Sequence, residues 1–405
     1  MKPPPEPLAT VPGAGRLAPG ATDRGPVDLD APLDEALALL GPCRRLTVLV
    51  NDPQRHTASR AVLERLARRV QPESIRLVVA TGSHHADAAT RTAFERALGR
   101  PAAGAVEWHD CRADDLLPVG PDGAWRGHPA LLAGDAVLAI GSVEPHYFAG
   151  YTGAHKTATI GVASFADIEA NHAAAMDLAC RPGLLAGNPV AEGVFSMLAA
   201  LEGVRPVAAV HLVQAGPQVL AAAGGATRAA LDEAVGWARE AFVRTVEPAA
   251  DALVAEVTGP LAESFYQADK GIKNTEWAVR DGGCLVLWAG CPRGIGQDAF
   301  CELLRQAPTY AAAVETVARR GYRLGDHKAV RLRYLTDPAT RGVRAFIVSP
   351  GLSDADANLL GLAKAPTVAA ALHAAGVRAE TDAIVHVRDA GNLAVTTNPS
   401  AGSGG

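Results

Sequence analysis

The chain lacks several features that mark specialised classes of protein. No stretch approaches the ~20 uninterrupted apolar residues that a membrane-spanning helix requires. The first five residues carry no apolar segment of the kind found in a secretory signal. The six cysteines, at positions 43, 111, 180, 284, 291 and 301, include no CxxC pair, so neither a zinc ribbon nor a disulfide framework is expected. These absences predict a cytoplasmic protein with reduced thiols.

An excess of positive charge is also missing. Lysine and arginine number 38 against 43 aspartates and glutamates, which gives a formal net charge of −5. No run of like charges extends beyond a few residues. Both facts argue against nucleic acid, and against a membrane surface, as a main partner.

What the chain does have is length and apolar content. Its 405 residues are 48% hydrophobic, and a single core stops growing at about 250–300 residues. Two domains are therefore expected. We predict a loosely ordered Pro- and Gly-rich leader at residues 1–28, followed by a first domain at 29–248 and a second at 249–388. The tail, residues 389–400, is a candidate for returning to the first domain, and residues 400–405 are predicted to form a flexible end.

Short apolar runs alternate with helical patterns along the chain. Helices are predicted at 57–69 and 87–98, between strands of the first domain. The predicted strands are residues 46–50, 75–80, 106–108, 136–140, 207–212, 251–257, 284–288, 343–348 and 383–387. This alternation predicts an α/β fold with two α/β domains and mostly parallel sheets. Functional groups should then lie in loops beyond the carboxyl ends of the strands.

Residues 144–157, EPHYFAGYTGAHKT, concentrate the chemistry of the first domain. A loop of small residues can bring the backbone close to an anion, with imidazoles and an amine around it. Residues 150–157 superficially resemble a phosphate-binding P-loop, but His155 replaces the glycine before Lys156 and no predicted strand directly precedes the loop. A nucleoside triphosphate site is therefore not expected, while binding of a single phosphate stays open.

Taken one at a time, these residues have ordinary structural explanations. His84 follows a predicted strand, where a neutral imidazole can act as a base, yet a histidine that hydrogen-bonds a neighbouring helix is commoner. His172, in a helix predicted at 165–178, is by itself more often structural than a metal ligand. In the second domain, Gln267 and Lys270 share a face if their segment is helical, and could together grip a carboxylate. An ordinary amphipathic turn is an equal alternative there.

Together, the motifs resemble the nickel-dependent lactate racemase family over nearly the whole chain after the leader. The spacing of His146, Lys156 and His172 is the specific part of this resemblance, since glycine turns alone are weak evidence. The resembling segments are residues 51–55, 80–84, 144–156, 171–172, 187–189 and 266–270.

The resemblance implies a fold, a cofactor and a reaction. The family has two α/β domains with the active site in the cleft between them. It uses a nickel-pincer nucleotide, Ni(II)-pyridinium-3,5-bisthiocarboxylic acid mononucleotide, supplied by cofactor-maturation enzymes. The implied activity is that of a racemase or epimerase, which inverts C2 of a 2-hydroxy acid by hydride transfer to and from this cofactor while two histidines exchange the hydroxyl proton.

The resemblance also implies roles for individual residues. Lys156 would carry the cofactor covalently, and His172 would be the metal ligand. His84 and His146 would be the catalytic pair. The other implied roles are cofactor binding by Asp52, Pro53, Gln54, Arg55, Thr152 and Gly153, and substrate binding by Arg55, Tyr266, Gln267 and Lys270.

Three departures from the family pattern leave these reacting groups in place. Pro53-Gln54 stands where a threonine is common, His155 where an arginine is usual, and Ile160 where a proline is usual. They bear on nucleotide contacts and on substrate identity, which ranges from lactate to aromatic, dicarboxylic and sugar acids. Two alternatives stay open: a zinc-dependent hydrolase, which no HxH or HExxH element supports, and a non-catalytic homologue that binds a hydroxy acid.

Overall fold

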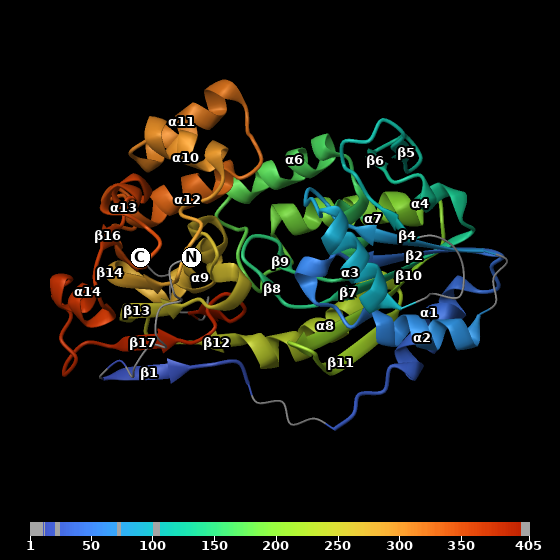
Figure 1. Cartoon of the computed structure of the whole chain (residues 1–405), viewed down its shortest axis with the longest axis horizontal. Coiled ribbons are helices and arrows are strands. Elements are labelled where there is room, and N and C mark those ends of the chain that lie inside the picture. Colours follow the sequence, from blue (N-terminus) through green and yellow to red (C-terminus); the bar gives the residue numbers. More distant parts are fainter. Residues whose placement is uncertain (1–10, 12, 21–24, 71–73, 100–105, 398–405) are drawn as a thin grey trace. The chain divides into compact units, whose positions relative to one another are not determined.

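The computed structural model of the chain describes residues 11, 13–20, 25–70, 74–99 and 106–397, and it consists of two compact units (Figure 1). The N-terminal unit is Ala21–Ala241; the C-terminal unit is Phe242–Gly405 together with Met1–Gly20. This division falls a few residues before the predicted domain boundary at 248–249. Among the described residues, none of the helices combines the length and apolarity that a membrane crossing needs.

The N-terminal unit is built on a six-stranded sheet with the strand order β11-β10-β7-β2-β3-β4. All neighbouring strands are parallel except β10 and β11, which form an antiparallel pair. The sheet thus matches the predicted mostly parallel arrangement. Its strands are β2 (Arg45–Asn51), β3 (Ser74–Ala80), β4 (Val106–Trp108), β7 (Ala136–Ser142), β10 (Val207–Ala215) and β11 (Gln218–Gly225).

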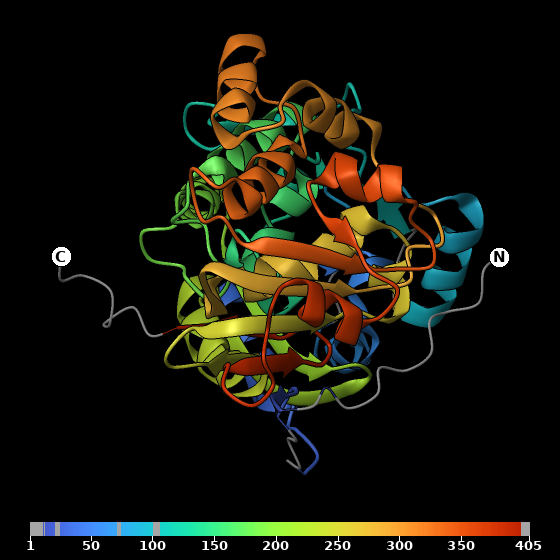
Figure 2. The same ribbon diagram turned by 90° about the vertical axis from the view of Figure 1, so that its left-hand side faces the viewer.

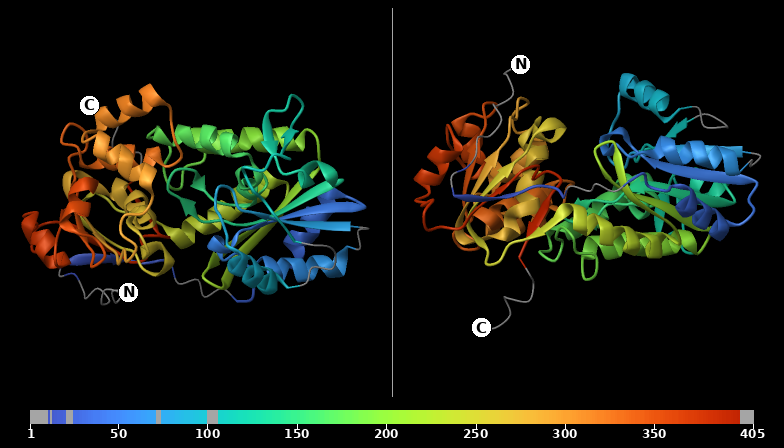
Figure 3. Two further views of the ribbon diagram at one scale, coloured as in Figure 1. Left: turned by 45° about the horizontal axis from the view of Figure 1, so that its top comes forward. Right: turned by 90° about the horizontal axis from the view of Figure 1, so that it is seen from below.

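Helices cover both faces of this sheet. Helices α1 (Asp30–Leu40) and α2 (Ser59–Arg69) pack on the face formed by alternate β7 residues, including Leu138 and Ile140; α2, in light blue, lies along the sheet in both views of Figure 3. Gly141 points to the opposite face, because successive residues of a strand alternate. There α5 (Ala154–Thr157) approaches the strand directly. The remaining helices of this unit are α3 (Ala88–Leu98), α4 (Ala130–Ala133), α6 (Phe165–Ala173), α7 (Pro189–Glu202) and α8 (Thr227–Phe242).

The C-terminal unit has an entirely parallel six-stranded sheet, with the order β1-β17-β13-β14-β15-β16. Figure 2 shows its strands stacked from β15 (orange) through β14 and β13 (yellow) to β17 (red). Helix α14 packs on one face through Val368 and Leu372. The strands are β1 (Ala14–Leu17), β13 (Ala250–Glu256), β14 (Val279–Trp288), β15 (Arg344–Val348), β16 (Ala363–Lys364) and β17 (Ile384–Val387); the helices are α9 (Phe265–Thr275), α10 (Asp298–Gln306), α11 (Tyr310–Arg320), α12 (Asp326–Thr336), α13 (Asp354–Leu360) and α14 (Val368–Ala374).

The α/β prediction is confirmed, and the structure adds detail at the leader, the tail and one helix. Part of the predicted loose leader is ordered, because Ala14–Leu17 pairs with β17 through main-chain hydrogen bonds that composition does not reveal. In the tail, β18 (Ala394–Thr396) pairs with β12 (Val243–Thr245), whose residues fall within the predicted first domain, 29–248, although the observed division assigns both strands to the C-terminal unit. The helix that carries His172 ends at Ala173 and continues as a 3-10 turn to Met176, short of the predicted residue 178. The predicted flexible end at 400–405 lies outside the described residues.

We expect Gly141→Ala to destabilise the N-terminal unit by about 1–3 kcal/mol, the usual cost of overpacking a core. A Cβ atom at position 141 would lie 2.5 Å from the main-chain nitrogen of Ala154, and backbone cannot swing aside as a side chain does. Urea unfolding measures the loss. The matched control is Gly236→Ala on α8, where no atom lies within 4 Å of the added Cβ; it should gain up to about 1 kcal/mol in helix propensity. Equal stabilities of the two variants would contradict this account.

Candidate active site

The candidate site lies where three adjacent strands of the N-terminal unit end. Strands β7, β2 and β3 are neighbours in the sheet, so the segments that follow them meet at one edge. There the Asp52 carboxylate accepts a hydrogen bond from His84 Nδ1 at 2.7 Å. Asp52 is buried, whereas 46% of the His84 side chain is exposed. A buried carboxylate thus fixes the orientation of an accessible imidazole.

Asn51, the last residue of β2, ties this edge together. Its amide nitrogen donates to Thr157 Oγ1 at 2.8 Å, next to Lys156 on α5. Its amide oxygen accepts from the main-chain nitrogen of Ser142 at 3.1 Å and from Thr57 Oγ1 at 2.9 Å. One side chain therefore links the ends of β2 and β7 to α5 and to the segment before α2.

Helix α5, which carries Lys156, is also fixed at its first residue by a histidine of the sheet. His211 on β10 is fully buried; its Nε2–H donates to the Thr227 carbonyl at 3.1 Å, so its Nδ1 can accept from the main-chain nitrogen of Ala154 at 3.2 Å. Burial lowers the pKa of His211 to about 4, which keeps the ring neutral and this acceptor available. Gly153 must lack a side chain, because a Cβ atom there would lie 2.8 Å from His155 Nδ1 in a backbone conformation with φ of 152°.

Phe148 is the common neighbour of three of the predicted site residues. Its ring lies edge-on to His146 at 4.5 Å and to His172 at 4.9 Å between ring centroids. The Lys156 ammonium lies 5.6 Å from the centre of the same ring. The hairpin β8 (Pro145–His146) and β9 (Gly150–Tyr151) carries Phe148 at its turn. The structure thus gathers residues 146, 156 and 172 around one aromatic side chain.

His172 is in the state that metal coordination requires. Burial lowers the pKa of His172 to about 3, and the charges of Lys156 and His84 push it in the same direction. The ring is therefore neutral at physiological pH. Its Nδ1 is buried and makes no hydrogen bond within the described part of the chain. A neutral imidazole with one ring nitrogen not engaged in a hydrogen bond is able to bind a transition metal.

Arg55 and Glu144 form an ion pair across the edge of the site. Their closest atoms, Nη1 and Oε1, are 2.7 Å apart, and both side chains are about a quarter exposed, at 25% and 26%. The pair joins the 3-10 turn Pro53–Arg55 to Glu144, which lies two residues after the end of β7. Arg55 keeps further donors for an anion, since a guanidinium has five N–H groups. Any anion that binds there shares the guanidinium with Glu144.

Two residues near Lys156 face inward. The Thr152 hydroxyl donates to the Ser142 carbonyl at 2.7 Å and is buried, so a nucleotide contact at this residue would fall to its main chain. His155 is buried too and stacks on Phe195, with 5.5 Å between ring centroids. Burial holds the pKa of His155 well below its usual range. The histidine that departs from the family pattern is therefore a neutral core residue.

The predicted substrate residues Tyr266, Gln267 and Lys270 belong to the C-terminal unit. The segment is helical, on α9, so Gln267 and Lys270 do share a face. Gln267 is exposed and Lys270 is partly exposed, whereas the intervening Asp269 is buried. Burial raises the pKa of Tyr266 to about 12, so its hydroxyl stays protonated. The site residues thus form two sets, one in each unit.

Phe148, Glu144 and His211 have structural roles at the site that were not predicted from the sequence. The first two lie in the motif already singled out, so their position was a usable signal. His211 lies on a strand with no motif around it, and no local pattern points to it.

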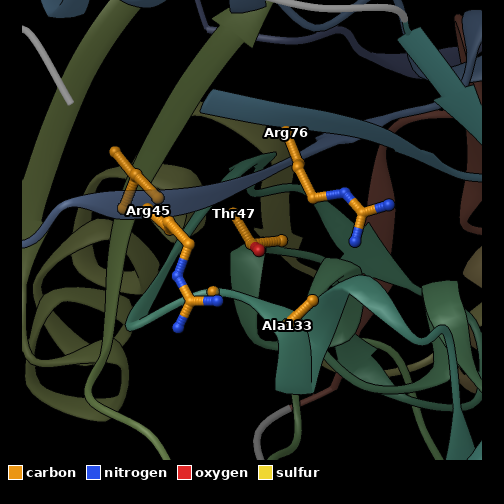
Figure 4. Close-up of a pocket in the computed structure, with 6 residues that line it drawn as sticks. Arg45, Thr47, Arg76 and Ala133 are labelled. Carbon is orange, nitrogen blue, oxygen red and sulfur yellow. The ribbon is translucent and has the colours of Figure 1, made fainter. Parts of the chain in front are cut away.

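A pocket elsewhere on the N-terminal unit is a weak candidate for a site. Figure 4 shows this cavity, of about 300 Å³, near Arg45, Thr47, Arg76 and Ala133. Arg45 begins β2, so the pocket lies at the end of the strand opposite Asn51 and Asp52. Arg45 is paired with Asp135 at 2.8 Å and Arg76 with Glu107 at 2.8 Å. Its cations are already neutralised by neighbouring carboxylates.

No group of three or more His, Cys, Asp or Glu side chains able to hold a metal is found within residues 11–397 where the structure describes them. A catalytic zinc ion usually takes three such ligands from the protein.

Family models match the chain in two consecutive parts. The model of the lactate racemase N-terminal domain matches residues 29–181, and the model of the lactate racemase C-terminal domain matches residues 246–395. Two relatives, both named lactate racemase, are similar in sequence. The protein from Thermoanaerobacterium thermosaccharolyticum is 23% identical over 69% of this chain and 67% of its own length. The protein from Lactiplantibacillus plantarum is 24% identical over 67% of this chain and 66% of its own length.

Solved structures are similar over most of the chain. The lactate racemase apoprotein from Thermoanaerobacterium thermosaccharolyticum aligns with a TM-score of 0.78 and 21% identity, covering 90% of this chain and 92% of that one. A protein from Thermotoga maritima aligns with a TM-score of 0.66 and 15% identity, covering 90% and 96%. At these identities the likeness shows the fold.

We expect Asn51→Ala to destabilise the N-terminal unit by about 1–3 kcal/mol, because the Ser142 N–H and the Thr157 hydroxyl lose a partner. Asn51→Asp, which keeps the acceptor and loses the donor, should fall between this variant and the wild type. Urea unfolding gives the three stabilities. Ser83→Ala, in the exposed loop beside His84, is the control and should stay within about 0.5 kcal/mol of the wild type. An Asn51→Ala protein as stable as that control would show that the hydrogen bonds of the Asn51 side chain do not contribute to stability.

Proposed function

The chain belongs to the lactate racemase family, and from this membership we propose that it inverts the C2 centre of a 2-hydroxy acid by hydride transfer at a covalently bound nickel-pincer nucleotide. The observation that carries the proposal is the gathering of His146, Lys156 and His172 around Phe148. The Asp52–His84 pair lies at the same strand ends. Distant relatives named lactate racemase support the reaction class.

The residues present fit this cofactor. Lys156 would be its covalent anchor, and His172 its protein ligand to nickel, for which imidazole beside sulfur is a reasonable donor set. A cofactor with its own sulfur and carbon donors needs few protein ligands, in keeping with the absence of a larger ligand cluster among the described residues. When bound, the cofactor supplies an acceptor for the hydride of C2 and can return it to either face.

The histidines would move the hydroxyl proton. Because a carboxylate can only accept, Asp52 holds the proton of neutral His84 on Nδ1 and leaves Nε2 as a base. His146 has the opposite arrangement: its Nδ1 accepts from the main-chain nitrogen of Ala149 at 3.2 Å, which places the proton on Nε2. One ring thus presents an acceptor and the other a donor. Such a pair suits a reaction in which a hydroxyl becomes a carbonyl and then a hydroxyl again.

The substrate carboxylate would be held by cations and amides from both sets. Arg55 offers its remaining N–H donors, and Gln267 and Lys270 offer an amide and an ammonium on one helical face. The Tyr266 hydroxyl, protonated throughout the physiological range, can donate a further hydrogen bond. Asp52, Pro53, Gln54, Thr152 and Gly153 stay assigned to the nucleotide. The cleft between domains that the resemblance implies for this site also stays a prediction.

The first test prepares the protein with its cofactor and screens it for interconversion of the enantiomers of 2-hydroxy acids. Protein co-produced with cofactor-maturation enzymes should gain the cofactor mass, contain about one nickel per chain, and interconvert the enantiomers of a 2-hydroxy acid. A panel should include lactate, aromatic, dicarboxylic and sugar acids. Lys156→Ala should lose all of the added mass, whereas His172→Ala should keep the mass of the covalently attached organic part and lower the nickel content.

The outcomes separate the alternatives. Loaded protein that binds a hydroxy acid without inverting it would identify a non-catalytic homologue. Unchanged cofactor attachment in Lys156→Ala would remove the proposal.

Variants of His84 and His146 should affect the reaction without affecting the loading of the cofactor. We expect His84→Gln and His146→Gln each to lower kcat by about 10²–10⁴, the usual contribution of a general acid or base. Intact mass and nickel content should not change, because neither side chain is assigned to the anchor or the metal. Asp52→Asn should follow His84→Gln in direction, since an amide no longer fixes the His84 proton. Full turnover in either histidine variant would contradict the assigned roles.

A further inference from the structure

One turn of helix α9 carries side chains that point to solvent and a side chain that points into the core. Gln267 is exposed and Lys270 is partly exposed, whereas Asp269 points inward and is completely buried. Neither carboxylate oxygen of Asp269 accepts a hydrogen bond of normal length within the described residues. A buried carboxylate in that situation needs a cation close by.

Lys328, on the neighbouring helix α12, is one such cation, and Lys273 on α9 itself is another. Its Nζ lies 3.7 Å from Asp269 Oδ2. It also donates to the Tyr266 main-chain carbonyl at 2.6 Å and lies 4.2 Å from the centre of the Tyr266 ring. One ammonium therefore contacts both the beginning of the turn and the residue directly before Lys270.

The other charges nearby are largely engaged with each other. Lys273 and Arg331 both pair with Glu276, at 3.1 Å and 3.2 Å, and all three side chains are buried. The charges of Lys273, Glu276 and Arg331 also act on Asp269, but Asp269 forms its ion pair with Lys328. Replacing such a pair by apolar residues is often neutral for stability or better, so stability alone does not account for it.

We propose that Lys328, acting with Asp269, is a positioning residue for substrate binding, which fixes the turn of α9 that presents Gln267 and Lys270. The proposal rests on the proposed function for the roles of Gln267 and Lys270. Neither Lys328 nor Asp269 needs to touch the substrate. Without the Lys328 ammonium, Asp269 loses its ion-pair partner and one of the two lysine charges that stabilise the carboxylate, and the turn that carries the two substrate residues loosens.

The position of this pair also gives substrate binding a dependence on pH. Burial lowers the pKa of Lys328 to about 8 and raises the pKa of Asp269. The charged groups that face Lys328 are Asp269, Lys270 and Lys273 on α9, with Glu276 and Arg331 beyond them. As the pH rises through about 8, Lys328 loses its proton and the ion pair, so KM should rise while cofactor loading stays constant.

The experiment compares Lys328→Met, Lys328→Arg and the double variant Lys328→Met/Asp269→Leu in the loaded enzyme. We expect Lys328→Met to raise KM roughly tenfold or more, with a smaller change in kcat. Lys328→Arg should restore most of the affinity and remove the rise in KM near pH 8, because arginine stays charged. The double variant should recover stability in urea without recovering KM. Lys364→Met, on β16 of the same unit, is the control and should match the wild type.

Hydrogen exchange supplies a readout that does not depend on the reaction. Amides of residues 265–270 should exchange faster in Lys328→Met than in the wild type, and Lys328→Arg should return them to protection. A wild-type KM in Lys328→Met, or a double variant that regains both stability and KM, would overturn the positioning role while leaving the proposed function intact. A wild-type enzyme that inverts no acid of the panel would instead count against the proposed function.

Discussion

The close seating of α5 on β7 is the constraint on which the site depends. Gly141 leaves no side chain between strand and helix, so the first residue of α5 lies directly over the sheet. The neutral His211 ring accepts the N–H of that residue, and Asn51 binds the helix at its far end. Lys156 is therefore carried by a very short helix whose position is set by the sheet. A single turn could not hold such a position on its own, because isolated helices of this length are unstable.

Electrostatics then divides the histidines of the chain by task. Burial keeps His155, His172 and His211 neutral, and each neutral ring serves a different purpose: packing, a metal ligand in our proposal, and a hydrogen-bond acceptor. His84 differs because about half of its side chain is exposed and because it has a carboxylate at its Nδ1. The same side chain is thus adapted by its surroundings, which sequence alone does not reveal.

The strands were predictable because parallel strands buried on both faces are continuous apolar runs, such as residues 46–50 and 136–140. Strand β1 was not, since it is an edge strand of four residues, AGRL, with only partial burial. The motif around Lys156 pointed to the candidate site, and its spacing suggested the family. Contacts between distant segments, such as Asn51 with Thr157 or Arg55 with Glu144, depend on strand order, which no local pattern encodes.

The pairing of β1 with β17 has a consequence for how the protein is assembled. Residues 14–17 and 384–387 are neighbours in one sheet, although the whole N-terminal unit lies between them in sequence. On the ribosome the N-terminal unit can finish folding while β1 waits for a partner that emerges some 370 residues later, and loop-closure entropy grows only slowly with such a length. A fragment that starts after residue 241 would expose the β17 edge, a surface open to pairing with other chains.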